Sequence, residues 1–171
     1  DTGAVYTTEV TPIGPRETAG ELLARLADIG APALVRTLEE LASGRARAIP
    51  QPEEGATYAR RLEKEDGRID WTGSAVRIDR QVRGLAPWPG AYCAFRDVRL
   101  KIHEVHPAPA DPPIEGPPDA PGQLRLAQGR VFCGTGEGFL ELIGVQPEGK
   151  PAMKGEEWAR GARLQAGEAL A

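Results

Sequence analysis

Residues 91–145 contain five short segments rich in β-branched and aromatic side chains, separated by glycine-rich or charged turns. This pattern constrains the fold most, because short strands at close spacing are typical of small barrels and sandwiches. Gln128-Gly129 and the stretch 134–138 supply hairpin turns. The sequence predicts five strands that form a small closed barrel, at Ala91–Phe95, Val98–Val105, Gly122–Ala127, Arg130–Gly134 and Phe139–Val145.

Helical patterns flank these strands on both sides. Ser74 caps an expected helix that ends at Leu85, and a turn at Pro87–Gly90 follows it. A second helix is expected at Lys154–Leu164, where Trp158 would pack on the barrel. The proline-rich stretch Pro107–Pro121 is predicted to be a long loop.

The first 48 residues carry signals for one strand and two helices. The β-branched residues favour a strand over Ala4–Ile13. Thr18 and Glu21 have capping-box spacing, which predicts a helix ending near Gly30, and a second helix is expected from Pro32 to Gly44. Because these elements cannot bury their own faces, we interpret them as the remnant of an α/β domain. A helical hairpin that decorates the barrel is the alternative.

Composition limits the function classes. No apolar run approaches the roughly 20 residues that span a bilayer. The chain begins with Asp1 rather than Met, so we expect residues upstream of it. The net charge is −4, so any contact with nucleic acid has to come from a local basic patch. Cys93 and Cys133 are far apart and form no metal-binding motif, which favours buried, reduced thiols in a cytosolic protein.

The strongest candidate patch is a basic segment ahead of the first predicted barrel helix. Its cations alternate with acids, so a solvated face of salt bridges is one interpretation and a contact with a phosphate backbone is the other. The helix predicted to end at Leu85 extends the same face with three arginines. The cations of the segment are Arg60, Arg61, Lys64 and Arg68, and those of the helix are Arg77, Arg80 and Arg83.

Other candidate residues offer weaker signals for catalysis or ligand binding. His103 and His106 have no nucleophile beside them, and residues three apart on a strand face opposite sides, which argues against a shared metal. The stretch 134–138 lacks the lysine of a phosphate loop and is better interpreted as a turn. The three tryptophans are expected to be core anchors rather than platforms for base stacking.

Three longer motifs carry a resemblance to a known family. The segment 56–71 reads ATYARRLEKEDGRIDW, and the turn 87–91 reads PWPGA. The segment 142–153 reads LIGVQPEGKPAM. This joint pattern, which spans most of the chain, resembles the linker and C-terminal module of bacterial methionyl-tRNA formyltransferases. Asp1-Thr2-Gly3 is similar to a segment of the family's catalytic domain.

The resemblance implies an oligonucleotide-binding-like (OB-like) barrel that docks tRNA during protein biosynthesis in the cytoplasm. It implies that the whole enzyme is a transferase that moves a formyl group from 10-formyltetrahydrofolate, without a metal, to the amino group of methionyl initiator tRNA. Asp1 would be a catalytic residue, and the N-terminal catalytic half would be missing, which leaves a monomeric chain inactive alone. The residues implied in RNA contact are Arg61, Lys64, Arg68, Arg83 and Lys150.

The same resemblance implies three regions. Residues 1–48 would be the C-terminal remnant of the catalytic domain, residues 49–72 the linker, and residues 73–171 the barrel with a helix at each end. Two alternatives stay open: a stand-alone RNA-binding barrel, and the barrel of a related sugar-nucleotide formyltransferase or formyltetrahydrofolate hydrolase.

Overall fold

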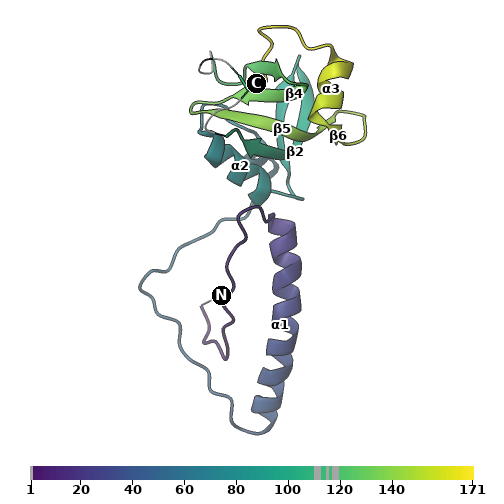
Figure 1. Ribbon diagram of the computed structural model, residues 1–171. Helices are drawn as coiled ribbons and strands as arrows, with labels where there is room; N and C mark the ends of the chain where they lie inside the picture. Colours follow the sequence, from purple (N-terminus) through teal and green to yellow (C-terminus); the bar gives the residue numbers. More distant parts are fainter. Residues whose placement is uncertain (1, 110–112, 115, 117–119) are drawn as a thin grey trace. The chain divides into compact units, whose positions relative to one another are not determined.

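The computed structural model describes residues 2–109, 113–114, 116 and 120–171 of the 171-residue chain (Figure 1). Asp1 and part of the predicted loop Pro107–Pro121 lie outside the described residues. The chain divides into two compact units, Asp1–Arg61 and Leu62–Ala171, which we call unit 1 and unit 2. None of the described helices is long and apolar enough to cross a membrane.

Unit 1 contains one long helix, α1, at Ala19–Ala42. It begins as predicted. The Thr18 hydroxyl accepts a hydrogen bond from the Glu21 backbone N–H, and the Glu21 carboxylate accepts one from the Thr18 N–H at 2.9 Å. The helix ends at Ala42 with Ser43 as its C-cap, and Gly44 follows with φ +69°, a conformation that glycine adopts without strain.

The predicted break between two helices is wrong, because α1 continues through both Gly30 and Pro32. Proline in a helix interior removes one backbone hydrogen bond, and glycine costs about 1 kcal/mol relative to alanine. The residues on both sides are mostly alanine, leucine and charged side chains, which favour the helix. Their combined preference outweighs the two local breakers.

The predicted strand Ala4–Ile13 is also wrong. Of these residues only Val5 joins a β-bridge, in which it exchanges two backbone hydrogen bonds with Ile49, at 2.9 and 2.8 Å. A strand needs a partner along its length, and unit 1 supplies one at a single position. The one strand and two helices expected for this region therefore become one helix with extended flanks.

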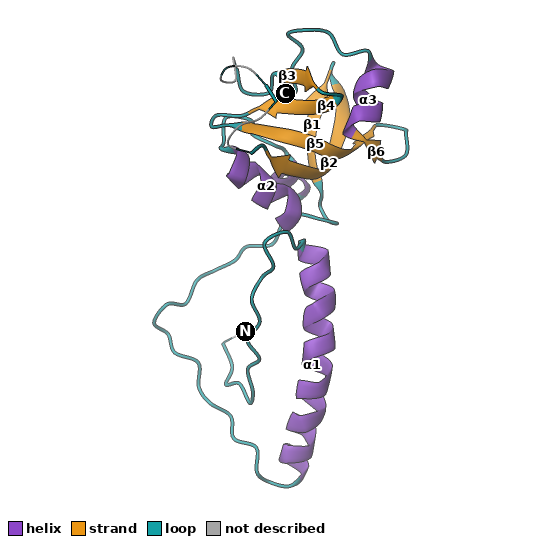
Figure 2. Ribbon diagram, in the orientation of Figure 1, coloured by secondary structure: helices purple, strands orange, loops and turns teal. Residues whose placement is uncertain are grey.

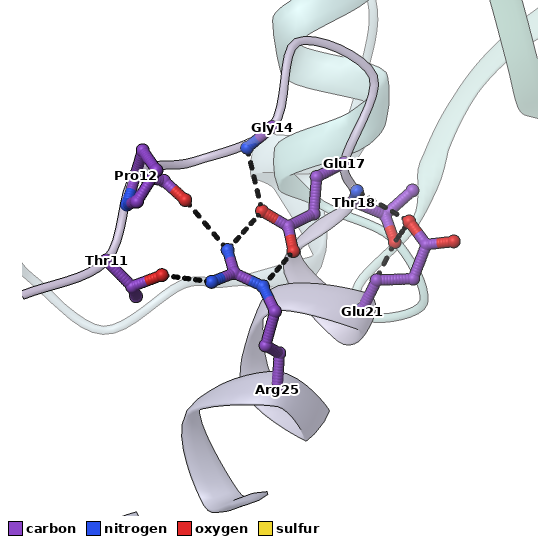
Figure 3. A network of polar contacts seen from close by, with 7 residues as sticks. All are labelled: Thr11, Pro12, Gly14, Glu17, Thr18, Glu21 and Arg25. Carbon is purple, nitrogen blue, oxygen red and sulfur yellow. Dashed lines mark hydrogen bonds and ion pairs between the residues drawn. The ribbon is translucent and has the colours of Figure 1, made fainter. Parts of the chain in front are cut away.

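Polar contacts hold the segment before α1 to its first turns (Figure 3). The Arg25 guanidinium donates to both carboxylate oxygens of Glu17 at 2.8 Å and to the Pro12 carbonyl. It also contacts the Thr11 hydroxyl. The Gly14 N–H donates to the Glu17 carboxylate at 2.9 Å. This network, more than apolar burial, organises the segment.

Unit 2 is built on one open antiparallel sheet in the order β1-β2-β5-β4-β3, with β6 paired to β5 (Figure 2). All five predicted strands are present, and β2 and β5 extend two residues further than predicted. The strands are β1 at Ala91–Phe95, β2 at Val98–Pro107, β3 at Leu124–Ala127, β4 at Arg130–Gly134, β5 at Phe139–Pro147 and β6 at Met153–Lys154.

The turns explain why the strands pair in this register. Gln128 and Gly129 link β3 to β4, and both have positive φ, at 51° and 77°. Arg96 and Asp97 form the same kind of two-residue turn between β1 and β2. Two central residues with positive φ match the twist of a hairpin, so the prediction of a turn at Gln128-Gly129 is confirmed.

Two helices pack on the sheet, as expected for a helix at each end. Helix α2, at Ala75–Gly84, is capped by Ser74 and contacts β2, and α3, at Gly155–Ala162, contacts β5. The core between them includes Ile78 of α2, Leu140 of β5 and Trp158 of α3, which meets Phe95 edge to face at 5.0 Å. The 3₁₀ helix η1, at Lys64–Gly67, precedes α2.

Closure of the sheet into a barrel stays a prediction, since the strand order β1-β2-β5-β4-β3 leaves β1 and β3 as edges that do not pair with each other. The last residues bond to both of its edges. Ala171 exchanges two backbone hydrogen bonds with Ala94 of β1. Leu124 of β3 donates to the Glu168 carbonyl, and Leu170 donates to the Gly122 carbonyl, both at 2.8 Å. The C-terminal segment thereby satisfies backbone groups that the edge strands would otherwise expose.

Candidate nucleic-acid interface

The predicted site residues fall in different settings. Asp1 lies outside the described residues. Arg61 is exposed at the end of unit 1. The other four predicted RNA contacts belong to unit 2, where Lys64, Arg68 and Lys150 are exposed and Arg83 is mostly buried. The candidate interface therefore belongs to unit 2.

Lys64 and Arg68 lie on the η1 segment, which two contacts fix to the module. The Gln81 side-chain amide of α2 donates to the carbonyls of Asp66 and Arg68, at 2.9 and 3.0 Å. Arg68 also forms an isolated parallel β-bridge with Tyr92 of β1, in which the Ile69 N–H donates to the Tyr92 carbonyl at 2.9 Å. A basic segment that looks like a linker in the sequence is thus attached to the folded sheet.

Gly67 explains how closely this segment approaches the sheet. A Cβ atom at this position would lie 2.2 Å from the Gly90 carbonyl oxygen, which is far inside contact distance. The absence of a side chain lets the backbone of η1 pass over the turn that leads into β1. The positions of Lys64 and Arg68 therefore depend on a glycine between them.

Arg68 also lines a cavity of about 320 Å³ together with Asp70, Arg77, Ile78 and Gln81. Asp70 is held by Thr72, whose hydroxyl and N–H donate to the carboxylate at 2.7 and 3.0 Å. These bonds lower the pKa of Asp70, so it stays ionised. The carboxylate offsets part of the positive charge of the two arginines, which leaves a site of mixed charge.

Arg83 differs from the other predicted RNA contacts. Its guanidinium Nε donates to the Asp79 carboxylate at 3.1 Å within α2, and the Arg83 and Asp79 side chains are only 16% and 6% exposed. A buried carboxylate needs such a partner, because an uncompensated charge in the core is costly. The structure thus gives Arg83 a structural role that sequence spacing did not indicate.

Lys150 lies in the turn between β5 and β6, next to a cavity lined by two cations that no sequence pattern singled out. A cavity of about 260 Å³ at this turn is lined by Arg99 and Lys101 of β2 and by residues 146–149. The alternation of side chains along a strand would have placed residues 99 and 101 on one face. That signal was present, but no spacing rule linked these strand residues to the basic segment.

The remaining candidates are accounted for by the fold. Gly136 in the stretch 134–138 donates its N–H to the carbonyls of Trp71 and Gly73, as expected for a turn packed on the module. Trp71 and Trp158 are buried in the core as predicted, whereas Trp88 is exposed. In the described part of the chain, no cluster of three or more His, Cys, Asp or Glu side chains could hold a metal ion.

Both cysteines are buried, as the sequence predicts. Burial raises the pKa of the Cys93 thiol to about 12 and raises that of Cys133 well above its usual value. Desolvation disfavours the thiolate, which is the reactive form of cysteine. These two thiols are therefore core residues rather than nucleophiles.

Unit 2 is thus a small antiparallel sheet with two packed helices and an attached basic segment, η1 and its flanks. The chain matches the family described as "Formyl transferase, C-terminal domain" over residues 61–163, and it belongs to that family. Curated relatives named methionyl-tRNA formyltransferase match nearly the whole chain. The protein from Streptomyces coelicolor is 44% identical over 98% of the chain, and that from Thermobifida fusca is 45% identical over 98%.

Each of these relatives is matched over 53% of its own length, so the chain spans about half the length of the proteins it resembles. Solved structures share the fold. A variant of HypX from Aquifex aeolicus aligns with a TM-score of 0.70 at 17% identity, over 98% of this chain and 29% of that one. WlaRD, a sugar 3N-formyl transferase, aligns with a TM-score of 0.60 at 14% identity, over 88% of this chain and 51% of that one.

Proposed function

We propose that this chain is the C-terminal part of a methionyl-tRNA formyltransferase and that it docks the tRNA. The observation that carries the proposal is the likeness to the Streptomyces coelicolor protein of that name, at 44% identity over 98% of the chain. The complete enzyme would transfer a formyl group from 10-formyltetrahydrofolate to the amino group of methionyl initiator tRNA. A solved HypX structure of the same fold contains tetrahydrofolic acid, which fits a folate donor for this fold family.

The reaction divides the work between the two halves of such an enzyme. The methionine amine attacks the formyl carbon, the bond from that carbon to the folate nitrogen breaks, and the amine proton passes to the leaving nitrogen. These steps need a base and donors to the developing oxyanion. We propose that this chemistry belongs to the other half of the protein, with Asp1 as one contributor.

We propose that the present chain contributes by positioning the tRNA substrate. Holding one end of a large substrate lowers the entropic cost of bringing the reacting groups together. We propose that Lys64 and Arg68, fixed to α2 and β1, contact the phosphate backbone of the tRNA, with Arg61 and Lys150 as further contacts. A rigid attachment suits this role, because a mobile cation would not orient the acceptor end.

Arg83 is the least suited of the five proposed contacts. Its side chain is only 16% exposed and its guanidinium bonds to Asp79, so it has less freedom to meet a phosphate. We propose that Arg83 contributes to RNA docking indirectly, by stabilising α2. Replacing it should then lower stability more than it lowers the salt dependence of tRNA binding.

The test uses the 171-residue chain, a folate formyl donor and charged initiator tRNA. We expect no formylation, but we expect tRNA binding that weakens steeply with salt. Lys64→Gln and Arg68→Gln should each lower the slope of log K against log salt by about 0.7 to 0.9, the value for one phosphate contact. Arg160→Gln, an equal loss of charge on α3, should leave the slope unchanged. Turnover by the chain alone, or binding independent of salt, would contradict the proposal.

The two other candidate functions have weaker support. The sugar 3N-formyl transferase WlaRD is similar to this chain at 14% identity, which supports a shared fold and not a shared substrate. A stand-alone RNA-binding module predicts the same salt slopes. It is distinguished by adding the other half of the protein, which should restore formylation only if the present proposal holds.

A further inference from the structure

The outer face of the sheet carries a row of side chains that the basic segment does not include. Tyr92 on β1, Lys101 on β2 and Gln146 on β5 occupy directly paired positions on three neighbouring strands. At each of these strands the alternate residues are buried, so these three face away from the core. Arg68 bridges Tyr92 and extends the row toward η1.

Arg99 lies on the same face as this row. Its guanidinium carbon is 3.8 Å from the centroid of the Tyr92 ring, in a cation–π arrangement. Stacking on the ring restrains the long arginine side chain while leaving its N–H groups free to donate sideways. The ring therefore acts as a support that keeps the charge of Arg99 on the outer surface.

The turn after β5 is fixed against the same face. The Gln146 side-chain amide donates to the Lys150 carbonyl at 2.9 Å, and its oxygen lies 3.1 Å from His103 Nε2 of β2. The Glu148 N–H donates to the Arg99 carbonyl at 3.1 Å. Because of these bonds, Lys150 is held on a fixed turn beside Arg99 and Lys101.

The positive charge of this surface is only partly offset from within. In the part of the chain that the structure describes, no carboxylate forms an ion pair with Arg99, Lys101 or Lys150, and all three residues are exposed. Glu148 lines the 260 Å³ cavity together with Arg99 and Lys101, and its carboxylate offsets part of their charge. Residues 61–101 as a whole carry nine lysines and arginines against six aspartates and glutamates, so the negative net charge of the chain lies elsewhere.

We propose that this outer face, which we call the Arg99–Lys101 surface, binds successive phosphates of an RNA strand as a second contact beside Lys64 and Arg68. The inference rests on the proposed tRNA docking and extends it to residues outside the basic segment. Paired strands lie about 4.8 Å apart, so the row from Arg68 through Tyr92 and Lys101 to Gln146 runs about 14 Å. An RNA strand carries several phosphates over that length.

Two features favour RNA phosphates over other occupants. Arg99 is exposed and already restrained by the Tyr92 ring, so binding removes little of its side-chain freedom. The cavity that Arg99 and Lys101 line admits a group the size of a phosphate. Tyr92 and Gln146 are positioning residues here, because one supports Arg99 and the other fixes the turn of Lys150.

The experiment measures the salt dependence of binding between the 171-residue chain and an initiator tRNA transcript. The double variant Arg99→Gln, Lys101→Gln should lower the slope of log K against log salt by about 1.4 to 1.8, as for two lost phosphate contacts. The matched control is Arg160→Gln, Arg163→Gln at the end of α3, which removes the same charge from two other exposed positions. It should change the slope little, and both variants should keep the melting temperature of the parent.

The outcomes separate this inference from the proposed function. If Lys64→Gln and Arg68→Gln lower the slope while the Arg99 and Lys101 variant does not, tRNA docking stands and the second contact is wrong. If the α3 control lowers the slope as much as the Arg99 and Lys101 variant, the effect is one of net charge and the surface is likewise wrong. If the parent chain shows no salt-dependent binding, the proposed docking and this inference both fail.

Discussion

Unit 1 and unit 2 come from one chain, yet they are held together in different ways. Unit 2 buries a continuous core that joins its sheet to α2 and α3. In unit 1 the one buried apolar residue among those described is Ala33, and its helix exposes a stripe of large apolar side chains. Strong local helix signals are present in both units. The contrast shows that such signals make a helix without providing a core for it.

The apolar stripe of α1 has a consequence for the whole protein. It consists of Leu34, Val35, Leu38 and Leu41, which are all more than 40% exposed. Exposed apolar surface of this kind is typical of a face that packs against another element. The proposed function includes a second half of the protein, and under that proposal we expect the second half to cover the stripe.

The largest expected effect tests the core of unit 2. Leu140 is fully buried, so Leu140→Ala should lower the free energy of unfolding by about 2 to 5 kcal/mol, from lost burial and the cavity left behind. All three tryptophans lie in unit 2, so urea unfolding followed by tryptophan fluorescence reports on this unit. Leu126→Ala on the exposed side of β3 is the control, with an expected change within about 0.5 kcal/mol. Equal losses would mean that the core does not dominate this unit.

The next effect tests how closely the backbone packs in unit 2. A Cβ atom on Gly155 would lie 2.0 Å from the Leu142 carbonyl oxygen, so Gly155→Ala should destabilise the unit by about 1 to 3 kcal/mol. Gly161 in the same helix has open space around its Cβ position. Gly161→Ala should therefore stabilise by about 0.5 to 1 kcal/mol, since alanine is the better helix former. Urea unfolding of both variants checks the two signs, and the same sign for both would contradict the packing argument.

The sequence predicted unit 2 much better than unit 1, and the reason is local information. The alternation of side chains and the turn at Gln128-Gly129 are signals that span only a few residues, and they predicted the five strands with nearly correct ends. The continuity of α1 through Pro32 depended on the sum of many weak preferences, which a single breaker residue obscured. The bridge between Val5 and Ile49 joins residues that no local pattern connects.

The candidate site shows the same limit. The basic segment was visible as a run of charges, but its attachment through Gln81 and Gly67 arises only on folding. The burial of Arg83 against Asp79 was hidden, because helical spacing gives the neighbours of a residue and not the direction of the core. Arg99 and Lys101 were missed for a related reason. Strand pairing places Lys101 opposite Gln146, whose side chain bonds to the Lys150 carbonyl, and sequence distance conceals this connection.

A smaller effect tests whether the stripe of α1 is uncovered. Leu38 is 55% exposed, so Leu38→Gln should change the thermal unfolding of α1, followed by circular dichroism, by less than about 0.5 kcal/mol in this chain. If the proposed second half is added, the same change should cost more, because that half would bury the stripe. A large loss in the present chain would show that α1 is already packed in solution, which would remove the contrast between the units.

The smallest expected effect concerns the polar network of unit 1. Hydrogen bonds from Arg25 and from the Gly14 N–H lower the pKa of Glu17 from 4.5 to about 2. A carboxyl whose pKa is lower in the folded state stabilises that state above pH 4.5, and this contribution is lost as the pH falls toward 2. Arg25→Gln should raise the pKa of Glu17 toward 4.5, as measured by an NMR titration of its carboxyl carbon.

Glu21 provides the control within the same titration, because its pKa is lowered by the capping bonds from Thr18 and not by Arg25. It should keep its lowered pKa in the Arg25→Gln variant. If Glu17 also keeps its value, Arg25 does not organise the segment before α1, and the helix cap alone accounts for the order there. If Glu17 shifts while Glu21 does not, unit 1 is held by a network of charges where unit 2 is held by its core.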